Sequence, residues 1–281
     1  MRILITGSSG QLGTQIARQL SQKNKIIGID VIPGTWTQHI MNITDRPAVD
    51  ALMNNIDAVI HIASLHAPHL TIHSKQAFID TNITGTLILL EAAARYHIRR
   101  FVYTSTTSLY GLALVPHDQS VWVTEELRPQ PRDMYDITKI TAEELCRHFA
   151  FAEGLPIICL RTARFFPEPP ELMAIYRLYR GVDVQDVAAA HVLAVTNQDI
   201  QFDVFNIAAL SPFQESDMPA LLRDAPSVLQ HRVPEAVHFF VQRGWSLPTS
   251  IDRVYVIEKA MQQLNYQPVY NFSRYISSLS D

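Results

Sequence analysis

Short apolar runs alternate with longer segments of helical periodicity over the first two-thirds of the chain. The short runs are rich in β-branched residues and predict strands at residues 3–6, 25–30, 57–61, 100–104 and 156–161. The segments between them carry apolar residues three and four positions apart and predict helices at about 11–23, 45–54, 75–96 and 134–153. Strands joined through helices of this length need crossover connections, so we expect them to run parallel. The strands are apolar throughout, which is typical of a sheet that helices cover on both faces.

The order of these elements predicts an α/β fold with a doubly wound parallel sheet, in which ligands bind at the carboxyl ends of the strands. We expect this nucleotide-binding domain to occupy residues 1–164, because the run FFPEPP at 165–170 breaks regular structure. Residues 165–281 are expected to form a small lobe that returns to the sheet, so the boundary is gradual. Within the lobe the pattern predicts a helix at 184–196, a strand at 204–207 and a helix near 253–264.

The composition is that of a globular protein with a large core. Of the 281 residues, 47% are apolar and 18% are charged, which excludes a disordered or low-complexity chain. The formal charge of −4 leaves no broad basic face, so we expect no nucleic-acid partner. Cys146 and Cys159 are too few for a disulfide framework or a cysteine-rich metal site, and we predict no metal. No apolar run approaches ~20 residues and no secretory signal stands out, so we expect a cytoplasmic protein without a membrane segment.

A glycine turn connects the first predicted strand to the first predicted helix. Gly7, Gly10 and Gly13 stand at G-x-x-G-x-x-G spacing within the segment Thr6–Gly13. Glycine is needed where the backbone turns tightly and approaches a pyrophosphate, and the unpaired N–H groups at the helix start then face the phosphates. A purely structural turn is the alternative, but the strand before and the helix after stand where phosphate binding requires them.

Asp30 ends the second predicted strand, 17 residues after Gly13. A carboxylate at this position can accept hydrogen bonds from an adenosine ribose and repels a 2′-phosphate. Val31, Ile32 and Pro33 follow, so no cation adjoins Asp30 to receive that phosphate. The sequence therefore favours NAD over NADP, with a loop aspartate that binds no ligand as the alternative.

A tyrosine and a lysine stand four residues apart at the start of the fourth predicted helix. Tyr135 and Lys139 share one helix face, so the phenol and the ammonium are expected to face the same space. A neighbouring cation lowers the pKa of a tyrosine from ~10 toward neutrality, which makes the phenol a usable general acid or base. A second pair, Tyr255 and Lys259, has the same spacing. We set it aside because Lys259 adjoins Glu258 in an expected surface helix, far along the chain from the hydroxyl cluster described next.

Hydroxyl side chains gather at the carboxyl end of the fourth predicted strand, in the run YTSTTSLYG at 103–111. Ligands of open α/β sheets bind outside the carboxyl ends of strands. A hydroxyl there can hydrogen-bond a substrate oxygen while the phenol exchanges its proton. A serine- and threonine-rich turn with local backbone hydrogen bonds is the alternative.

Together these motifs resemble the extended short-chain dehydrogenase/reductases, specifically the NAD-dependent epimerase/dehydratase family. The resemblance runs from Met1 to about Arg161 and resumes in patches. It implies a Rossmann-type fold, NAD as the cofactor and a small sugar-like substrate. It also implies a homodimer, in which the helices at 75–96 and 134–153 pair across the interface.

The resemblance assigns roles to particular residues. The implied catalytic set is Thr106, Tyr135 and Lys139, with Thr106 at the hydroxyl position five residues before Gly111. The residues expected to bind the cofactor come from the glycine turn and from the ends of the strands: Gly7, Gly10, Gln11, Leu12, Gly13, Asp30, Asn42, Ile43, Ile62, Ala63, Ser64, Thr104, Tyr135 and Lys139. Asn42 stands where the family usually has an aspartate. The residues expected to contact the substrate are Thr106, Tyr135 and Arg164.

Two departures from the family pattern concern the substrate. After Arg161 the family often continues with an aromatic residue and an asparagine, whereas here Thr162-Ala163-Arg164 places Arg164 at the asparagine position. Many members then insert a much longer segment before a valine–aspartate helix start, which Gly181–Val187 resembles after about 20 residues. The elements that hold the nucleotide of a nucleotide-sugar are therefore shortened, which favours a smaller and possibly acidic substrate.

Histidines and arginines outside these motifs leave alternatives open. The spacing of His66, His69 and His73 suits a metal face on a helix, but Pro68 favours a loop, and the resemblance places His66 near the cofactor. Arg177 and Arg180 are either solvated charges or an anion-binding pair. The resembled family often supplies a substrate arginine from the C-terminal region, where the candidates are Arg243 and Arg253.

The function that these residues predict is NAD-dependent oxidation at a secondary alcohol of a sugar or nucleotide-sugar. Tyr135 would take the hydroxyl proton, Thr106 would orient the oxygen, and Lys139 would lower the tyrosine pKa and bind the ribose. Net epimerisation and net oxidation both follow from this step, and a simple sugar or uronate dehydrogenase is the first alternative. A protein that senses NAD without turnover is the second, and the complete catalytic set argues against it.

Overall fold

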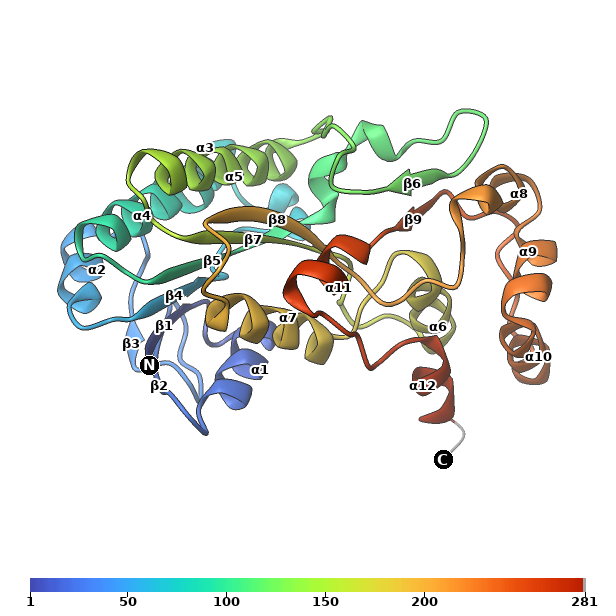
Figure 1. Cartoon of the computed structure of the whole chain (residues 1–281), viewed down its shortest axis with the longest axis horizontal. Helices are drawn as coiled ribbons and strands as arrows, with labels where there is room; N and C mark the ends of the chain where they lie inside the picture. The colour runs from blue at the N-terminus through green and yellow to red at the C-terminus, as the bar shows by residue number, and fades with distance from the viewer. Residues whose placement is uncertain (280–281) are drawn as a thin grey trace.

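The computed structural model describes residues 1–279 and has a parallel sheet at its centre, drawn in Figure 1. Seven strands form this sheet in the order β3-β2-β1-β4-β5-β7-β8, and every neighbouring pair is parallel. Their bounds are β1 Arg2–Thr6, β2 Lys25–Asp30, β3 His39–Ile40, β4 Ala58–His61, β5 Arg100–Thr106, β7 Ile157–Thr162 and β8 Phe202–Ile207. The predicted doubly wound α/β fold is confirmed, with the short edge strand β3 missed.

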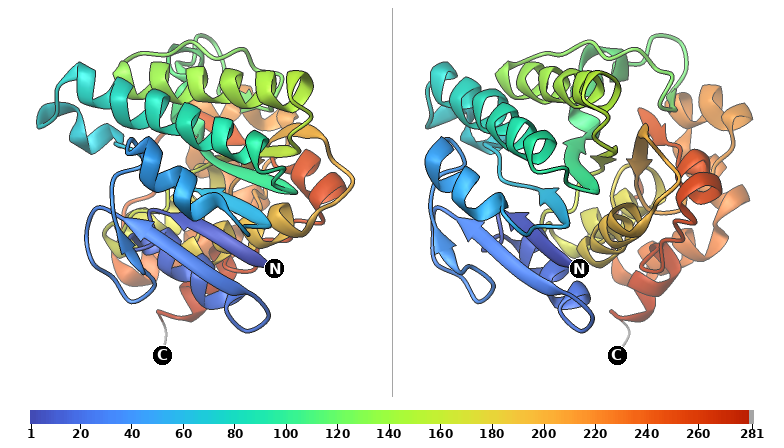
Figure 2. Two further views of the ribbon diagram at one scale, coloured as in Figure 1. Left: turned by 90° about the vertical axis from the view of Figure 1, so that its left-hand side faces the viewer. Right: turned by 60° about the vertical axis from the view of Figure 1, so that its left-hand side comes forward.

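Helices cover both faces of the sheet, as the apolar strands predict (Figure 2). Side chains of a strand alternate between faces, so Ile3 and Ile5 of β1 join one core cluster and Leu4 joins the other. The first face carries α1 Gln11–Leu20 and α7 Val184–Thr196; the second carries α2 Arg46–Met53, α4 Gly85–Arg95 and α5 Met134–Ala152. Each fully buried Leu or Ile of these layers contributes about 1.5–3 kcal/mol to stability.

The predicted helix at 75–96 is interrupted by a wider π-helical turn. It consists of α3 Lys75–Phe78, the π turn Ile79–Thr84 and α4. The turn carries the buried Asn82, whose side-chain amide donates to the Leu65 carbonyl and to Thr138 Oγ1, each at 3.0 Å. Asn82 of the π turn therefore connects the loop after β4 to α5, beside the candidate site. Helical periodicity in the sequence does not reveal this connection.

The stretch Lys75–Arg95 has the length and composition of a membrane-crossing helix, with a mean hydropathy of 1.2. Half of it is buried inside the fold, and a core helix of a globular domain has the same composition. It lies between α2 and α5 in the layer described above. Its apolar residues are therefore accounted for by packing within this chain.

The C-terminal lobe contains helices that the sequence reading missed. They are α6 Pro170–Tyr179, α8 Met218–Arg223, α9 Ala225–Arg232, α10 Pro234–Arg243 and α12 Phe272–Ser277, and they share a third core cluster. Prolines in this region suggested interruptions. In the structure Pro170, Pro219, Pro226 and Pro234 lie in the first turns of their helices, where an N–H group has no partner to lose.

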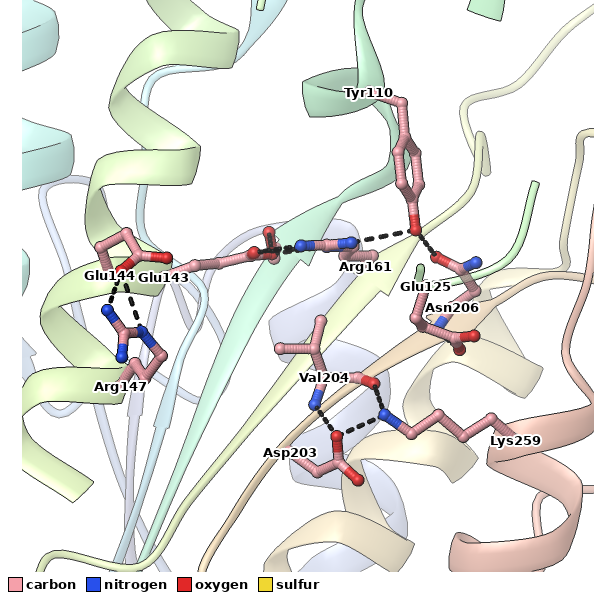
Figure 3. Close-up of polar contacts among 11 residues, drawn as sticks. Tyr110, Glu125, Glu143, Glu144, Arg147, Arg161, Asp203, Val204, Asn206 and Lys259 are labelled. Atoms are coloured by element: carbon pink, nitrogen blue, oxygen red, sulfur yellow. Dashed lines mark hydrogen bonds and ion pairs between the residues drawn. The ribbon is translucent and has the colours of Figure 1, made fainter. Parts of the chain in front are cut away.

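The expected helix near 253–264 is wrong in its first part. Residues 253–255 form β9 Arg253–Tyr255, which pairs in parallel with β6 Val121–Val123, and only then does α11 Glu258–Leu264 begin. Tyr255 and Lys259 therefore do not share a helix face. Lys259 forms an ion pair with Asp203 and donates to the Val204 carbonyl at 3.0 Å (Figure 3).

A buried ion pair joins α5 to strand β7 of the sheet (Figure 3). Glu143 and Arg161 are 4% and 7% exposed, and Arg161 Nη2 lies 2.7 Å from Glu143 Oε2. Arg161 Nη1 also donates to the Tyr110 hydroxyl at 3.0 Å, which in turn donates to Asn206 Oδ1 at 2.8 Å. The chain of bonds fixes α5 against β7, β8 and the hydroxyl loop that follows β5.

This network predicts that removing one partner destabilises the fold strongly. Glu143→Ala leaves the Arg161 cation buried without its carboxylate, so we expect the free energy of unfolding to fall by about 3–5 kcal/mol. Denaturant titration followed by circular dichroism measures the change.

The neighbouring pair Glu144–Arg147 provides the control, because its side chains are 61% and 57% exposed (Figure 3). Glu144→Ala should change the free energy of unfolding by about 0.5 kcal/mol or less. Equal effects of the two substitutions would contradict the assignment of the buried pair.

Candidate active site

The glycine turn after β1 is as tight as the sequence predicts. Gly7 has a φ of +73°, and a Cβ on Gly13 would lie 2.2 Å from the Gly7 carbonyl oxygen. Gly10 precedes the first residue of α1 and supplies no capping side chain. The first N–H groups of α1 are therefore available to an anion, which the positive end of the helix attracts.

The loop after β2 packs onto this turn, a contact that sequence reasoning missed. Ser8 Oγ and Ser9 Oγ lie 2.6 and 2.7 Å from Thr37 Oγ1. The loop approaches so closely that a Cβ on Gly28 would lie 1.8 Å from the Trp36 carbonyl oxygen. Gly28, inside a strand that is otherwise apolar, was the available signal of a close backbone approach.

Asp30 lies at the end of β2, beside the turn. One carboxylate oxygen accepts from the backbone N–H groups of Val31 and Ile32 at 2.7 and 3.2 Å, and the other accepts from Ser9 N–H at 3.0 Å. A carboxylate offers about four acceptor positions, so about one remains. That position fits a ribose hydroxyl, and its negative charge disfavours a phosphate.

One cavity of about 1060 Å³ brings the predicted site residues together. Its wall contains each residue predicted to bind the cofactor and each predicted catalytic or substrate residue: Gly7, Gly10, Gln11, Leu12, Gly13, Asp30, Asn42, Ile43, Ile62, Ala63, Ser64, Thr104, Thr106, Tyr135, Lys139 and Arg164. Typical ligand pockets occupy about 300–1,000 Å³, so this cavity is large enough for a dinucleotide with a small substrate beside it.

The three predicted catalytic residues meet at one end of this cavity. Thr106 Oγ1 accepts from the Ser108 N–H at 3.1 Å, and it hydrogen-bonds the phenol of the buried Tyr135. Lys139 Nζ donates to the Thr104 carbonyl at 2.6 Å and lies 4.3 Å from the centre of the Tyr103 ring. The ammonium is thus anchored to the end of β5, under the cavity floor formed by Thr104.

The predicted lowering of the tyrosine pKa is wrong for the protein groups by themselves. Burial raises the pKa of Tyr135; the Thr106 hydrogen bond lowers it, and the charges of Asp136 and Asp133 raise it further. Burial also lowers the pKa of Lys139 to about 8, against the opposite effect of Glu143. Tyr135 therefore keeps its proton at neutral pH.

His66 adds an aromatic wall beside Tyr135. The centre of its ring lies 6.1 Å from that of Tyr135 and 6.3 Å from that of Phe166. Burial, with the charges of Lys139 and then His69, lowers the pKa of His66 to about 4, so the imidazole is neutral at pH 7. The rings of His66 and His69 are 5.7 Å apart, yet residues 1–279 contain no cluster with the arrangement of a metal site.

The structure separates the arginines that the sequence left undecided. Arg180 and Arg253 line the cavity, whereas Arg177 is buried beside Asp183, and Arg243 bonds the Leu279 carbonyl away from it. Arg253 Nη2 forms an ion pair with Asp252, while its buried Nε has no hydrogen-bond partner. Arg180 has no carboxylate within 4.0 Å among residues 1–279, so its guanidinium retains capacity for an anion.

Comparison with known proteins places this chain in a family. Residues 3–171 match the NAD dependent epimerase/dehydratase family, and this match covers more than half of the chain. The protein belongs to the NAD-dependent epimerase/dehydratase family, and its cofactor is NAD. The cavity residues fit that cofactor, because the glycine turn offers N–H groups to phosphates and Asp30 offers a carboxylate oxygen to a ribose.

Relatives with described functions are distant in sequence. YtcB of Bacillus subtilis, described as an uncharacterized UDP-glucose epimerase, is 26% identical over 201 residues, covering 64% of this chain and 62% of that protein. The present chain thus spans less than two-thirds of the length of YtcB. A dTDP-glucose 4,6-dehydratase of Streptomyces antibioticus is 24% identical over 330 residues, covering 100% of this chain and 92% of the relative.

Solved structures support the fold over the whole length. A short-chain dehydrogenase/reductase superfamily protein from Agrobacterium tumefaciens with bound NAD has a TM-score of 0.75 at 19% identity, covering 99% of this chain and 95% of that one. The UDP-glucose 4-epimerase of Thermotoga maritima, solved with UDP-glucose, has a TM-score of 0.73 at 19% identity, covering 100% and 99%. Both similarities extend through the C-terminal lobe.

The carboxylate of Asp30 predicts the cofactor preference. Asp30→Ala removes the acceptor for the ribose hydroxyl and the charge that repels a 2′-phosphate, so NAD binding should weaken roughly 10-fold while NADP binding improves. Isothermal titration calorimetry with both dinucleotides measures the change. Unchanged preference in this variant would contradict the role of Asp30.

The charge of Asp133 predicts a change in the pH profile. Asp133→Asn keeps the cap of α5 but removes a negative charge that raises the pKa of Tyr135. The tyrosine pKa therefore falls, and the limb along which alcohol oxidation rises with pH should move to lower pH by roughly 0.5 to 1 pH unit. Rates of NADH formation between pH 5 and 10 test this, and a shift to higher pH would contradict it.

Proposed function

We propose that this protein is an NAD-dependent oxidoreductase or epimerase that acts on a secondary hydroxyl of a sugar or nucleotide-sugar. The observation that carries the proposal is the convergence of Thr106, Tyr135 and Lys139 at one end of a cavity whose wall also holds the glycine turn and Asp30. A cofactor bound along this wall and a hydroxyl beside Tyr135 would share the same space. Membership of the family supports the same reaction type.

Each catalytic side chain has a distinct role in this proposal. When bound, NAD accepts a hydride from the carbon that carries the substrate hydroxyl. Thr106 Oγ1 accepts from Ser108 N–H, which fixes its position, and its O–H would donate to the substrate oxygen in place of the Tyr135 phenol. Tyr135 would receive the hydroxyl proton in its phenolate form, after the phenol has lost its own proton to solvent. Lys139, whose pKa burial lowers to about 8, is anchored to the Thr104 carbonyl and would donate its remaining N–H groups to the cofactor ribose.

The cavity wall favours oxidation or inversion over loss of water. Eliminating water from a sugar requires a proton acceptor at one carbon and a proton donor at the leaving hydroxyl, in addition to the phenol. Among residues 1–279, Asp30 is the one carboxylate that lines the cavity, and it lies at the glycine turn. The catalytic end offers hydroxyls, a phenol and neutral His66, so a carboxylate pair for dehydration is missing from the described wall.

The charge of the lobe supports an anionic substrate. Arg180 and Arg253 both line the cavity, and Arg180 has no carboxylate partner among residues 1–279. Arg164 lines the same wall and forms an ion pair with Glu168. A phosphate or another anionic group of the substrate would gain charge-assisted hydrogen bonds there.

The role of Tyr135 predicts the loss of turnover in Tyr135→Phe. Without the phenol the proton has no acceptor, so kcat/KM should fall roughly 10²- to 10⁴-fold while NAD affinity stays within about twofold. The assay screens nucleotide-sugars, free aldoses and uronates, following NADH absorbance and, separately, product stereochemistry. The matched control is Tyr96→Phe, at an exposed tyrosine at the end of α4. Full activity of Tyr135→Phe with every accepted substrate would overturn the proposal.

A further inference from the structure

Arg132 is a cavity residue to which the sequence reading assigned no role. It lies three residues before Tyr135, at the entrance to α5, and it lines the cavity at the catalytic end. Two further cavity arginines, Arg180 and Arg253, come from the C-terminal lobe. The cavity therefore has a second cationic position, next to the residues that would perform the chemistry.

Asp136 holds Arg132 in one orientation. The Asp136 carboxylate is fully buried, and one of its oxygens accepts from both the backbone N–H and Nε of Arg132 at 3.2 Å. Its other oxygen accepts from Ser108 Oγ at 2.6 Å, and Arg132 Nη2 closes the ring by donating to Ser108 Oγ at 3.1 Å. A guanidinium held through both Nε and Nη2 loses little freedom when it binds a ligand.

The held guanidinium retains a free donor. The Arg132 side chain is 41% exposed, whereas the carboxylate that balances its charge is 0% exposed. Nη1 has no hydrogen-bond partner among residues 1–279. The Arg132 guanidinium is therefore partly accessible to a ligand, whereas the Asp136 carboxylate that compensates its charge is buried.

The same ring of bonds connects Arg132 to the catalytic hydroxyl. Ser108, which bonds both Asp136 and Arg132, also donates its N–H to Thr106 Oγ1. Thr106, in turn, hydrogen-bonds the phenol of Tyr135. A group that Arg132 binds would thus belong to the part of the substrate that carries the reacting hydroxyl, not to a distant tail.

We propose that Arg132 binds a carboxylate on the sugar itself, so that the substrate is a uronic acid or its nucleotide derivative. The inference rests on the function proposed above and narrows its substrate class. A carboxylate suits a single guanidinium with one free donor edge, because carboxylate recognition by arginine needs two N–H groups at most. A phosphate dianion recruits more donors, such as a helix N-terminus or several cations.

The test compares matched substrates that differ in one group. For wild type and Arg132→Gln, kcat/KM is measured with glucuronate and glucose, and with their UDP derivatives. We expect wild type to prefer the acid of each pair. In Arg132→Gln, kcat/KM for the acid should fall roughly 10- to 100-fold relative to wild type, the range for a lost charge-assisted hydrogen bond. The kcat/KM for the neutral sugar should stay within about threefold of the wild-type value.

The control variant is Arg128→Gln, which removes an exposed arginine of the same loop that does not line the cavity. It should leave both values unchanged. An equal fall for acid and neutral sugar in Arg132→Gln would show that Arg132 only supports the loop, and it would overturn the proposal. A fall confined to glucose 6-phosphate, assayed in parallel, would assign Arg132 to phosphate instead and overturn it as well.

A binding measurement separates this inference from the proposed function. If none of these sugars is oxidised or epimerised, the proposed function fails. Calorimetry of the NAD-loaded protein with glucuronate then still decides the inference. Binding that weakens at least 10-fold in Arg132→Gln supports it, and equal binding, or none by wild type, contradicts it.

Discussion

Burial of the Tyr135 phenol is the constraint on which the chemistry of this protein depends. A phenol that is 7% exposed and flanked by Asp133 and Asp136 resists ionisation, because both the lack of solvent and the nearby negative charges penalise phenolate. Lys139 does not cancel this penalty, since its ammonium is directed to the Thr104 carbonyl. The tyrosine therefore keeps its proton at neutral pH in the protein by itself.

Helix α5 carries the polar groups that keep this site in shape. Glu143 binds Arg161 in the sheet, Asp136 binds Ser108 in the hydroxyl loop, and Thr138 accepts a bond from Asn82 in the π turn. Each bond joins α5 to a different neighbour, so the phenol, the catalytic hydroxyl and the loop after β4 are fixed relative to one another. Figure 3 shows the first of these contacts, between Glu143 of α5 and Arg161 of β7.

Local patterns were enough to predict six of the seven strands and the glycine turn, and the family resemblance supplied the list of expected site residues. Three patterns are local: the apolar strands, the glycine turn and the four-residue spacing of Tyr135 and Lys139. Each can be recognised from neighbouring residues, because none depends on contacts between distant parts of the chain. The lobe was harder, because no helix was predicted around Pro219, Pro226 and Pro234, although each lies in a first helical turn. Periodicity alone also extended a helix over residues 253–255, where pairing with β6 makes a strand.

Properties that depend on contacts across the fold were beyond the sequence. Arg132 looked like one charge among many, since its ring of bonds joins residues 24 to 28 positions apart. The choice of Arg253 over Arg243 required the position of β9, and the tyrosine pKa required the burial of its ring. The four-residue spacing predicts that Lys139 lies near Tyr135. It does not reveal that the ammonium donates to the Thr104 carbonyl, or that the Tyr135 ring is buried from solvent.

Transfer of a deuterium label tests the central claim most directly. A sugar substrate deuterated at the carbon that bears the reacting hydroxyl is incubated with the protein and NAD, and the label is followed by mass spectrometry and NMR. The account predicts that deuterium passes to the nicotinamide, or returns to the same carbon in an epimerised product, without exchange with water. Product that has lost its deuterium to solvent would show proton removal from carbon and would contradict a phenol-assisted hydride transfer.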